Sequence, residues 1–349
     1  MITSAIFEKP GEALQLQSFQ MPELKPDQIL VRVEACTICG SDLHTYRGLR
    51  KEKTPTILGH EAIGFVEKTI GDSLAFDGTK LEVGDRITWS VCANCGDCDR
   101  CLGSLPQKCR GLKKFGHEQV LDQGPFFGGL SNYVVLPGST PIFKISQDFP
   151  AEVICPANCA TATVLACMEK TGNVFGKKAL ILGAGLLGLT ATAYCKANGA
   201  ASVDVLDREP SRLNLAQRFG ADRILPAEQG WETSANEYDL IVDLAGSVET
   251  IQKAMTRLAM GGVFVIGGTV MPCDDLVFNP ERLLRNLHSI VGVHNYRPDH
   301  LALAIRFLEQ HVDNYPFKEL VAKSFPLAKI NEAFDFALTE RPIRVMVKP

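Results

Sequence analysis

Several features that would assign a protein to a broad class are missing from this sequence. The 349 residues carry a net charge of −4, so no basic excess indicates a nucleic-acid partner. The N-terminus has neither the basic start nor the apolar run of a signal peptide. There are no internal repeats and no low-complexity segment that would form a flexible linker. These absences predict a cytoplasmic globular protein that binds neither nucleic acid nor membrane.

Long apolar runs are scarce as well. The uncharged run 179–195 is short for a membrane span and contains a Gly-x-Gly-x-x-Gly motif. A buried strand that leads into a buried helix explains this run better. With 46% hydrophobic residues the chain can bury a substantial core, but 349 residues exceed what one ordinary core supports. We therefore expect two domains.

The pattern of apolar residues changes along the chain. Up to about residue 90, short β-branched runs at 29–35, 62–67 and 85–89 predict a small, mostly antiparallel β domain. From about residue 155, strands and helices alternate, which is typical of a parallel α/β sheet. The expected later elements are strands at 177–182, 201–207, 240–243, 263–268 and 289–293, a helix at 301–310 and a strand at 344–347. This pattern predicts a first domain over 1–158, an α/β domain over 159–297 and a tail, 298–349, that returns to the first domain.

Five of the twelve cysteines lie within 92–109. Because the chain is too long for a small disulfide scaffold, this crowding indicates metal binding. Cys95, Cys98, Cys101 and Cys109 can close around one zinc ion, since two-residue gaps let a tight turn point successive sulfurs at one centre. Such a site has no open position and would fix a loop. The alternatives are a redox Cys-x-x-Cys pair, chance clustering of the cysteines, or a site with Cys92 in place of Cys109, which would crowd all four ligands into ten residues.

A second candidate metal site lies earlier in the chain. Cys39, His60 and Glu61 supply a thiolate, an imidazole and a carboxylate, which are the ligands that zinc prefers. Ser41 and His44 follow Cys39 at short spacing and could move a proton away from a group bound to the metal. The alternative is a buried cysteine, a polar turn and a hydrogen-bonded histidine without a metal.

The Gly-x-Gly-x-x-Gly motif at 183–188 has the context that gives it meaning. It follows an expected strand, opens an expected helix and lies 19 residues before Asp207, at the end of the next strand. This arrangement predicts a dinucleotide site, because the glycines let the backbone approach the pyrophosphate and the helix N-terminus attracts it. Asp207 would bind the adenosine ribose and repel a 2′-phosphate, which favours NAD over NADP, although Arg208 and Arg212 oppose that preference. The residues assigned to the cofactor are Gly183, Gly185, Leu187, Gly188, Asp207 and Arg212.

Together these motifs resemble the zinc-dependent medium-chain alcohol dehydrogenases, and the likeness covers essentially the whole chain. The resemblance implies a GroES-like β domain, a Rossmann domain with a doubly wound parallel sheet, and an active site in the cleft between them. It also implies two zinc ions per chain, one catalytic and one structural, with NAD as the cofactor. Members of the family form homodimers by joining the sheets of their coenzyme domains edge to edge, and these dimers often pair into homotetramers. Segment 289–293 is the candidate edge strand.

The resemblance also assigns metal ligands by motif position. Cys39 and His60 match ligands of the catalytic zinc, and Cys159 falls where many members carry a third protein ligand. Other members bring Glu61 onto the metal, so Glu61, Cys159 and water remain open as the variable ligand. The four cysteines that match the family's structural zinc lobe are Cys95, Cys98, Cys101 and Cys109.

The implied reaction is the oxidation of an alcohol by NAD through a zinc-bound alkoxide. In the family pattern, Asp42 orients His60, and Ser41 and His44 relay the proton of the alcohol to solvent. A polyol, amino-alcohol or aldehyde dehydrogenase on the same scaffold is the alternative, and a non-catalytic NAD-binding protein is a further one.

Two features of the sequence bear on the substrate, namely a basic segment and a resemblance to one subgroup of the family. Segments 103–109, 114–117 and 293–298 resemble a bacterial subgroup associated with phosphonate catabolism. Segment 47–53 contains four basic residues and one acidic residue, so Arg50 and Lys51 are candidates to bind a phosphonate or carboxylate end of the substrate. His117 is a candidate pocket residue. The alternative is that these charges form a solvated loop.

Overall fold

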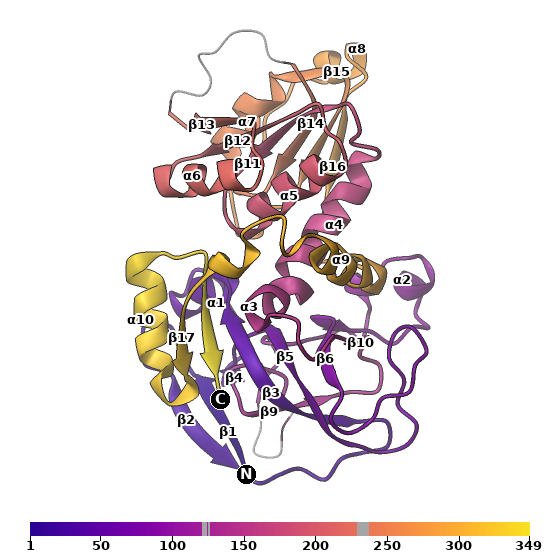
Figure 1. Ribbon diagram of the computed structural model, residues 1–349, viewed down its shortest axis with the longest axis vertical. Helices are drawn as coiled ribbons and strands as arrows, with labels where there is room; N and C mark the ends of the chain where they lie inside the picture. Colours follow the sequence, from indigo (N-terminus) through magenta and orange to yellow (C-terminus); the bar gives the residue numbers. More distant parts are fainter. Residues whose placement is uncertain (121–123, 125, 229–236) are drawn as a thin grey trace. The chain divides into compact units, whose positions relative to one another are not determined.

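The computed structural model describes residues 1–120, 124, 126–228 and 237–349 (Figure 1). The chain divides into two compact units. Unit 1 comprises Met1–Cys159, Arg297–Val312 and Phe317–Pro349, and unit 2 comprises Ala160–Tyr296 and Asp313–Pro316. The expected boundaries at 158/159 and 297/298 each differ from this division by one residue. Segment Asp313–Pro316 groups with unit 2 rather than with the rest of the tail.

Unit 1 is organised by strand β3 (Ile29–Ile38), which lies inside a seven-stranded sheet. β3 runs antiparallel to β5 (Glu61–Thr69) and to β18 (Arg344–Lys348), so its end lies beside the beginnings of both neighbours. Three stretches far apart in the sequence therefore meet where these strands end, on one side of the sheet. The other strands of this sheet are β6 (Arg86–Trp89), β9 (Tyr133–Leu136), β10 (Ile142–Lys144) and β17 (Val321–Pro326).

Two smaller sheets and a set of short helices complete unit 1. A three-stranded sheet contains β1 (Ile2–Phe7), β2 (Gln15–Phe19) and β4 (Thr56–Ile57), and a two-stranded sheet contains β7 (Cys92–Ala93) and β8 (Lys113–Lys114). The helices and 3-10 turns are α1 (Gly40–Tyr46), α2 (Asp99–Leu102), η1 (Pro106–Lys108), α3 (Ala151–Ile154), η2 (Cys155–Asn158), α9 (Pro298–His311), η3 (Phe317–Leu320), η4 (Leu327–Lys329) and α10 (Ile330–Glu340).

Unit 2 contains a six-stranded parallel sheet in the order β13-β12-β11-β14-β15-β16. This order, with the first strand in the middle, is that of a doubly wound dinucleotide-binding fold, and the switch point lies between β11 and β14. The strands are β11 (Lys178–Leu182), β12 (Ser202–Asp207), β13 (Arg223–Pro226), β14 (Tyr238–Asp243), β15 (Leu258–Ile266) and β16 (Ser289–Gly292). The helices are α4 (Ala160–Thr171), α5 (Leu186–Ala197), α6 (Pro210–Arg218), α7 (Val248–Met255) and α8 (Pro280–Arg285).

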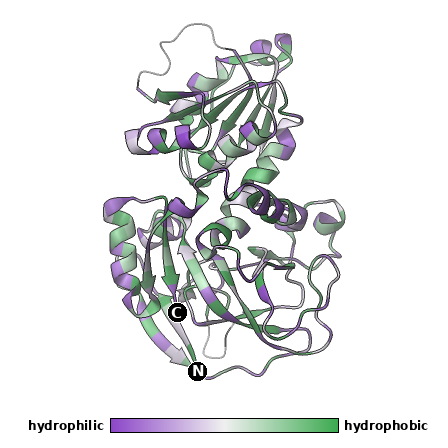
Figure 2. Cartoon of the chain, in the orientation of Figure 1, coloured by the Kyte–Doolittle hydropathy of each residue, from purple (hydrophilic) through white to green (hydrophobic). Residues whose placement is uncertain are grey.

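The hydrophobic strands of unit 2 stand out in Figure 2. The uncharged run 179–195 forms nearly all of β11, the turn after it and most of α5, and most of its side chains are buried. A strand that is covered on both faces needs such a continuous apolar sequence. Within the residues that the structure describes, no single helix is long and apolar enough to cross a membrane, although the bent pair Ala151–Asn158 and Ala160–Thr171 meets the length and composition test.

Several elements were absent from the sequence prediction, among them β13, β17 and α10. β13 and β17 are edge strands with mostly exposed or half-exposed side chains. They therefore lack the alternation of apolar and polar residues that predicts a strand. Their hydrogen-bonded partners hold them in the sheet. α10 packs on β17 and β18 and buries Phe334 and Ala337. Tertiary pairing, rather than local pattern, defines these elements.

Candidate metal centre and cofactor site

Four side chains of unit 1 meet beside the end of β3 and the beginning of β5 in its large sheet. One ligand atom each from Cys39, His60, Glu61 and Cys159 lies within 4.8 Å of all the others. Cys39 follows β3 and caps helix α1, whereas Glu61 opens β5. All except the half-buried Cys159 are buried. Two thiols, an imidazole and a carboxylate at this separation match the donor set of a tetrahedral zinc site.

The charges around these side chains also suit a cation. A hydrogen bond from Cys159 holds the pKa of Cys39 well below its usual range against the effect of burial, and Arg344 adds to this shift. Burial lowers the pKa of His60, but Asp42 and Cys39 outweigh burial and raise it to about 10. The surroundings therefore stabilise both a thiolate and a positive charge in the same small space.

Asp42 connects the two chain segments that carry the first ligands. Its Oδ2 accepts a hydrogen bond from the backbone N–H of Cys39 at 2.9 Å, and its Oδ1 accepts one from the backbone N–H of Gly59 at 3.1 Å. The same Oδ1 lies 3.5 Å from His60 Nδ1, which is an electrostatic contact at the limit of hydrogen-bond range. Because Nδ1 faces Asp42, Nε2 of His60 is the nitrogen left for a metal.

Glu61 is held by groups other than a metal. Arg344 donates from Nε to Oε2 at 2.8 Å and from Nη2 to Oε1 at 2.9 Å, and Thr37 donates its hydroxyl to Oε2 at 2.6 Å. Burial raises the pKa of Glu61 to about 7, and Arg344 acts against that rise. For Arg344, burial lowers the pKa, but the Glu61 carboxylate outweighs it and leaves the pKa above its ordinary value. The structure thus shows Glu61 in an ion pair.

Ser41 and His44 both lie on helix α1 and are half-buried. They form no hydrogen bond with each other, and Nδ1 of His44 is buried without a partner among the described residues. Burial lowers the pKa of His44. His44 therefore tends to stay neutral, but a proton path from Ser41 to His44 would need a bridging group.

The three predicted substrate residues have different surroundings. Arg50 Nε and His117 Nδ1 each lie 2.8 Å from the same oxygen of Glu52. The ring of His117 stacks on that of His60, with the centroids 5.6 Å apart. Lys51 is exposed. The structure thus places Arg50 and His117, but not Lys51, in one bonded cluster next to the metal site.

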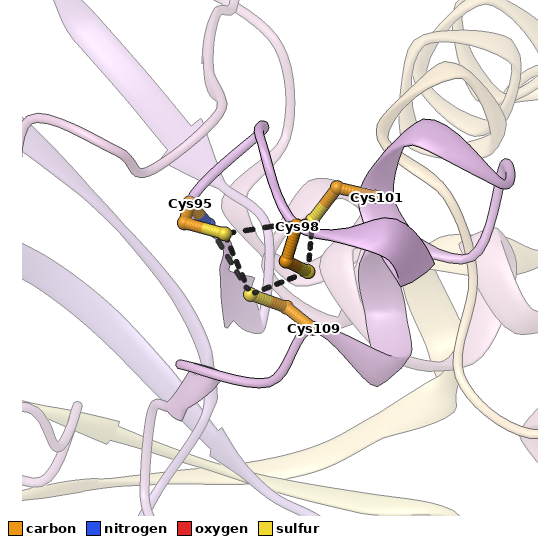
Figure 3. A group of neighbouring side chains, drawn as sticks. All are labelled: Cys95, Cys98, Cys101 and Cys109. Carbon is orange, nitrogen blue, oxygen red and sulfur yellow. Dashed lines mark hydrogen bonds between the residues drawn. The ribbon is translucent and has the colours of Figure 1, made fainter.

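The four predicted lobe cysteines come together around one point (Figure 3). Their sulfurs lie 3.3 Å (Cys95–Cys109), 3.5 Å (Cys98–Cys101), 3.9 Å (Cys95–Cys101) and 4.0 Å (Cys98–Cys109) apart. Tetrahedral zinc with Zn–S bonds of about 2.3 Å requires sulfurs about 3.8 Å apart, so the cluster fits. Backbone N–H groups of Arg110 and Cys101 lower the pKa of Cys98 to about 6. Cys92 is buried in β7 and lies outside the cluster.

In unit 2, the glycine motif forms the turn between β11 and α5. Gly183 has a φ of +99°, which glycine adopts without strain. A Cβ on Gly188 would overlap the carbonyl oxygen of Gly183, so glycine is required for α5 to approach the strand. A Cβ on Gly185 would meet nothing within 4 Å. The open space at the helix N-terminus is where a pyrophosphate binds in this kind of turn.

Asp207 lies at the end of β12 and reaches this turn. Its Oδ2 accepts a hydrogen bond from the backbone N–H of Ala184 at 2.6 Å, and its Oδ1 accepts one from that of Glu209 at 2.8 Å. Leu187 on α5 and Arg212 on α6 are both half-buried. The structure therefore brings Asp207 to the glycine turn, as a ribose-binding acid requires.

Sequence reasoning missed several residues that organise these sites. Arg344 was read only as part of a final strand, and Glu52 only as an opposing charge. Asp243, buried at the end of β14, accepts hydrogen bonds from the backbone N–H groups of Ala245 and Gly246 at 3.1 and 2.9 Å. Its place at the carboxyl end of a parallel strand was a usable signal, because ligands bind at that edge. No local pattern marks Arg344 or Glu52.

Comparisons with known proteins identify the family of the chain. Residues 25–147 match the alcohol dehydrogenase GroES-like domain, and residues 187–310 match the zinc-binding dehydrogenase family. The chain is 30% identical over 346 residues to an alcohol dehydrogenase of Geobacillus stearothermophilus, with 95% of each chain covered. It is 27% identical to a D-arabitol-phosphate dehydrogenase of Enterococcus avium over 98% of this chain and 96% of the relative.

Solved structures give the same result. An alcohol dehydrogenase of Thermotoga maritima superimposes with a TM-score of 0.94 at 26% identity, over 100% of this chain and 99% of the other. The predicted combination of a GroES-like β domain and a Rossmann domain is confirmed. The chain is therefore an oxidoreductase that belongs to the zinc-binding alcohol dehydrogenase family.

Proposed function

We propose that the protein oxidises an alcohol with NAD as the hydride acceptor and uses two zinc ions per chain. The observation that carries this proposal is the convergence of Cys39, His60, Glu61 and Cys159 within 4.8 Å, with Asp42 behind His60. The open glycine turn of unit 2, with Asp207 beside it, supports the nucleotide site. Because Asp207 would repel a 2′-phosphate, NAD is the preferred cofactor over NADP.

The catalytic zinc would be held by Cys39, His60 and Cys159. Glu61 is engaged by Arg344 and Thr37, which supports an open fourth position for water or substrate. A zinc ion bound here supplies a Lewis acid that favours loss of the hydroxyl proton of an alcohol. The second zinc would be held by the lobe cysteines, Cys95, Cys98, Cys101 and Cys109, and would fix the lobe without an open position.

The chain's own residues would handle the proton and the cofactor. Ser41, two residues after Cys39, would accept the proton, and His44, kept neutral by burial, would receive it through a bridging group. In unit 2, the backbone of the glycine turn would bind the pyrophosphate, and Asp207 would bind the ribose.

The names of other relatives suggest a second class of substrate. Relatives that match most of the chain include an erythritol/L-threitol dehydrogenase and several L-threonine 3-dehydrogenases, so a polyol or an amino alcohol is the second candidate. We also propose that the protein acts in the cytoplasm and forms a homodimer or homotetramer. The edge position of β16 in its sheet supports an assembly through this strand.

The first test combines metal analysis with NAD reduction. Purified protein should contain two zinc ions per chain and should reduce NAD, in preference to NADP, with at least one alcohol in a panel of simple alcohols, polyols and amino alcohols. Cys39→Ser should lower the catalytic zinc occupancy and the rate, whereas Cys98→Ser should remove the lobe zinc. Cys92→Ser is the matched control and should retain both ions. Full zinc occupancy with no NADH from any alcohol would contradict the proposed function.

A further inference from the structure

A group of charged side chains beside the metal site has no part in the reaction proposed above. Oε1 of Glu52 lies 2.8 Å from Arg50 Nε and 2.8 Å from His117 Nδ1. The side chains of Arg50, Glu52 and His117 are only 27%, 10% and 8% exposed. A carboxylate shielded in this way holds its two partners more firmly than a solvated carboxylate would. Glu52 therefore fixes both the guanidinium and the imidazole.

This cluster is attached to the metal ligands. The ring of His117 stacks on that of His60 at an interplanar angle of 30°. Gly116, which precedes His117, lies against Gly59, which precedes His60. A Cβ on Gly116 would lie 3.1 Å from the carbonyl oxygen of Gly59, so the backbones of these two turns approach closely. The turn that carries His117 is therefore packed against the turn that carries His60.

A second cation belongs to the same turn. The backbone N–H of His117 donates to the carbonyl of Lys114 at 3.1 Å. The half-buried Lys114 ammonium forms no hydrogen bond or ion pair with any residue that the structure describes. Burial lowers the pKa of Lys114 and nearby Arg50 lowers it further, whereas Cys92, Cys159 and Glu52 act in the opposite direction. Lys114 is thus within electrostatic range of both the cluster and the metal site.

The hydrogen-bonding capacity of these cations is mostly unused. Arg50 forms an ion pair with Glu52 through Nε, and its two Nη groups have no hydrogen-bond or ion-pair partner among the described residues. Glu52 is paired with Arg50, whereas the Lys114 ammonium has no carboxylate at ion-pair distance among the described residues, and Glu118 contacts only its backbone N–H, at 3.0 Å. Partly buried cations are normally paired, because desolvation of an unpaired charge is costly. An anionic ligand would supply the missing partner.

We propose that Arg50 and Lys114 form the receptor for an anionic group on the alcohol substrate, and that Glu52 positions Arg50 and His117 for it. The group would be an oxyanion such as a carboxylate, a phosphonate or a phosphate ester, which the forked guanidinium binds with two hydrogen bonds. This inference rests on the proposed function, because it assumes that the hydroxyl of the same molecule is oxidised at the metal site.

The rest of the basic segment provides a matched control. Lys53 carries the same charge a few residues along the chain, but it is exposed and belongs to no cluster in the described residues. If general positive charge attracted the substrate, Lys53 would matter as much as Arg50. If a built receptor binds the anion, only Arg50 and Lys114 matter.

The kinetic test uses isosteric alcohols that differ in charge. The anionic member 2-hydroxyethylphosphonate is paired with neutral 3,3-dimethyl-1-butanol, and 4-hydroxybutanoate is paired with 4-methyl-1-pentanol. Arg50→Ala and Lys114→Met should each raise KM for the anionic members by about tenfold and leave the neutral members within about twofold. Lys53→Ala should change neither. Equal effects on both members of a pair would overturn the inference while the proposed function stands, whereas no NADH from any alcohol would count against the proposed function.

A binding measurement keeps the inference testable even if none of these four alcohols is oxidised. Ethylphosphonate carries the anion but no hydroxyl, and its affinity for the zinc-loaded protein can be measured by calorimetry. It should bind about tenfold more weakly to Arg50→Ala and to Lys114→Met than to the wild type or to Lys53→Ala. Glu52→Gln should weaken binding while thermal unfolding shows an intact fold. Equal affinity in the wild type, Arg50→Ala and Lys114→Met would overturn the inference.

Discussion

Arg344 and Glu61 lie 283 positions apart in the sequence and form a two-point ion pair inside unit 1. The carboxylate is fully buried and the guanidinium nearly so, and Nη2 of Arg344 also lies 3.6 Å from the sulfur of Cys39. The final strand of the chain therefore sets the charge environment of a candidate metal ligand. Removal of the arginine would leave a buried carboxylate without its main partner.

Arg344→Met should lower the free energy of unfolding by about 3–5 kcal/mol, because breaking a buried ion pair leaves an uncompensated charge. The double variant Arg344→Met with Glu61→Leu should recover most of that loss, since both charges are then absent. Denaturant unfolding of the two variants and the wild type measures this. A loss below about 1 kcal/mol in the single variant would show that Thr37 alone satisfies Glu61.

Asp42→Asn should weaken binding of the catalytic zinc by roughly 10–100-fold. The amide keeps the shape of the carboxylate but loses the negative charge that faces His60 Nδ1. Competition with a chelator, read as zinc retained per chain, measures the affinity. Asp72→Asn, which alters an exposed carboxylate, serves as control and should leave zinc affinity unchanged. Equal affinity in both variants would contradict the positioning role of Asp42.

The contribution of His44 should depend on pH in a defined direction. Burial lowers the pKa of His44 below its ordinary value of 6.5, so more than half of the imidazole is neutral and able to accept a proton at pH 6.5, and the neutral fraction approaches one at higher pH. The ratio of kcat for alcohol oxidation between the wild type and His44→Gln should therefore approach a plateau as the pH rises above 6.5. It should fall at lower pH, as the imidazole becomes protonated. We expect a ratio of at least about tenfold on the plateau.

Profiles of kcat against pH for both proteins provide the ratio, and stopped-flow NADH formation separates chemistry from product release. A ratio that falls to half of its plateau value above pH 6.5 would mean that the local environment stabilises the imidazolium instead. A ratio of one at all pH values would exclude His44 from the proton path.

Two glycines of the cofactor turn should respond differently to the same substitution. Gly188→Ala places a methyl group on the carbonyl oxygen of Gly183, so α5 must shift, and the free energy of unfolding should fall by about 1–3 kcal/mol. Gly185→Ala meets no protein atom within 4 Å, and it should change stability by less than about 0.5 kcal/mol.

Both glycine variants should bind NAD at least about tenfold more weakly, as measured by fluorescence titration. For Gly185→Ala the reason is that the methyl group occupies the space needed by the pyrophosphate. If Gly185→Ala bound NAD as tightly as the wild type, the pyrophosphate would not lie against this turn.

Local chemistry explains why some predictions from the sequence agree with the structure. The lobe cysteines follow one another at gaps of two and seven residues, so short-range chain geometry suffices to bring them together. Each of the four sulfurs lies within 4.0 Å of two others. The glycine turn depends on backbone freedom at Gly183 and close approach at Gly188, and both are properties of the residue itself. The buried strand β11 is a continuous apolar run that only a covered strand explains.

Other features required the folded chain. The sequence shows Glu61 beside His60 and leaves open whether the carboxylate binds the metal. The antiparallel pairing of β3 with β18 brings Arg344 to that carboxylate. No sequence pattern near Arg344 predicts this ion pair. The basic segment 47–53 showed a positive balance, but only the structure shows that Glu52 binds Arg50 and His117 and that Lys51 is exposed.

The sequence by itself thus indicated the family, the lobe cysteines and the nucleotide motif, because the spacing of cysteines and glycines along a short stretch determines their local geometry. The candidate ligands Cys39, His60 and Cys159 are spread over the chain, and only the fold brings them together. The tertiary structure decided which charges neutralise one another and which remain available. Coulomb interactions depend on distance and burial in space, and distance along the chain does not report either of them.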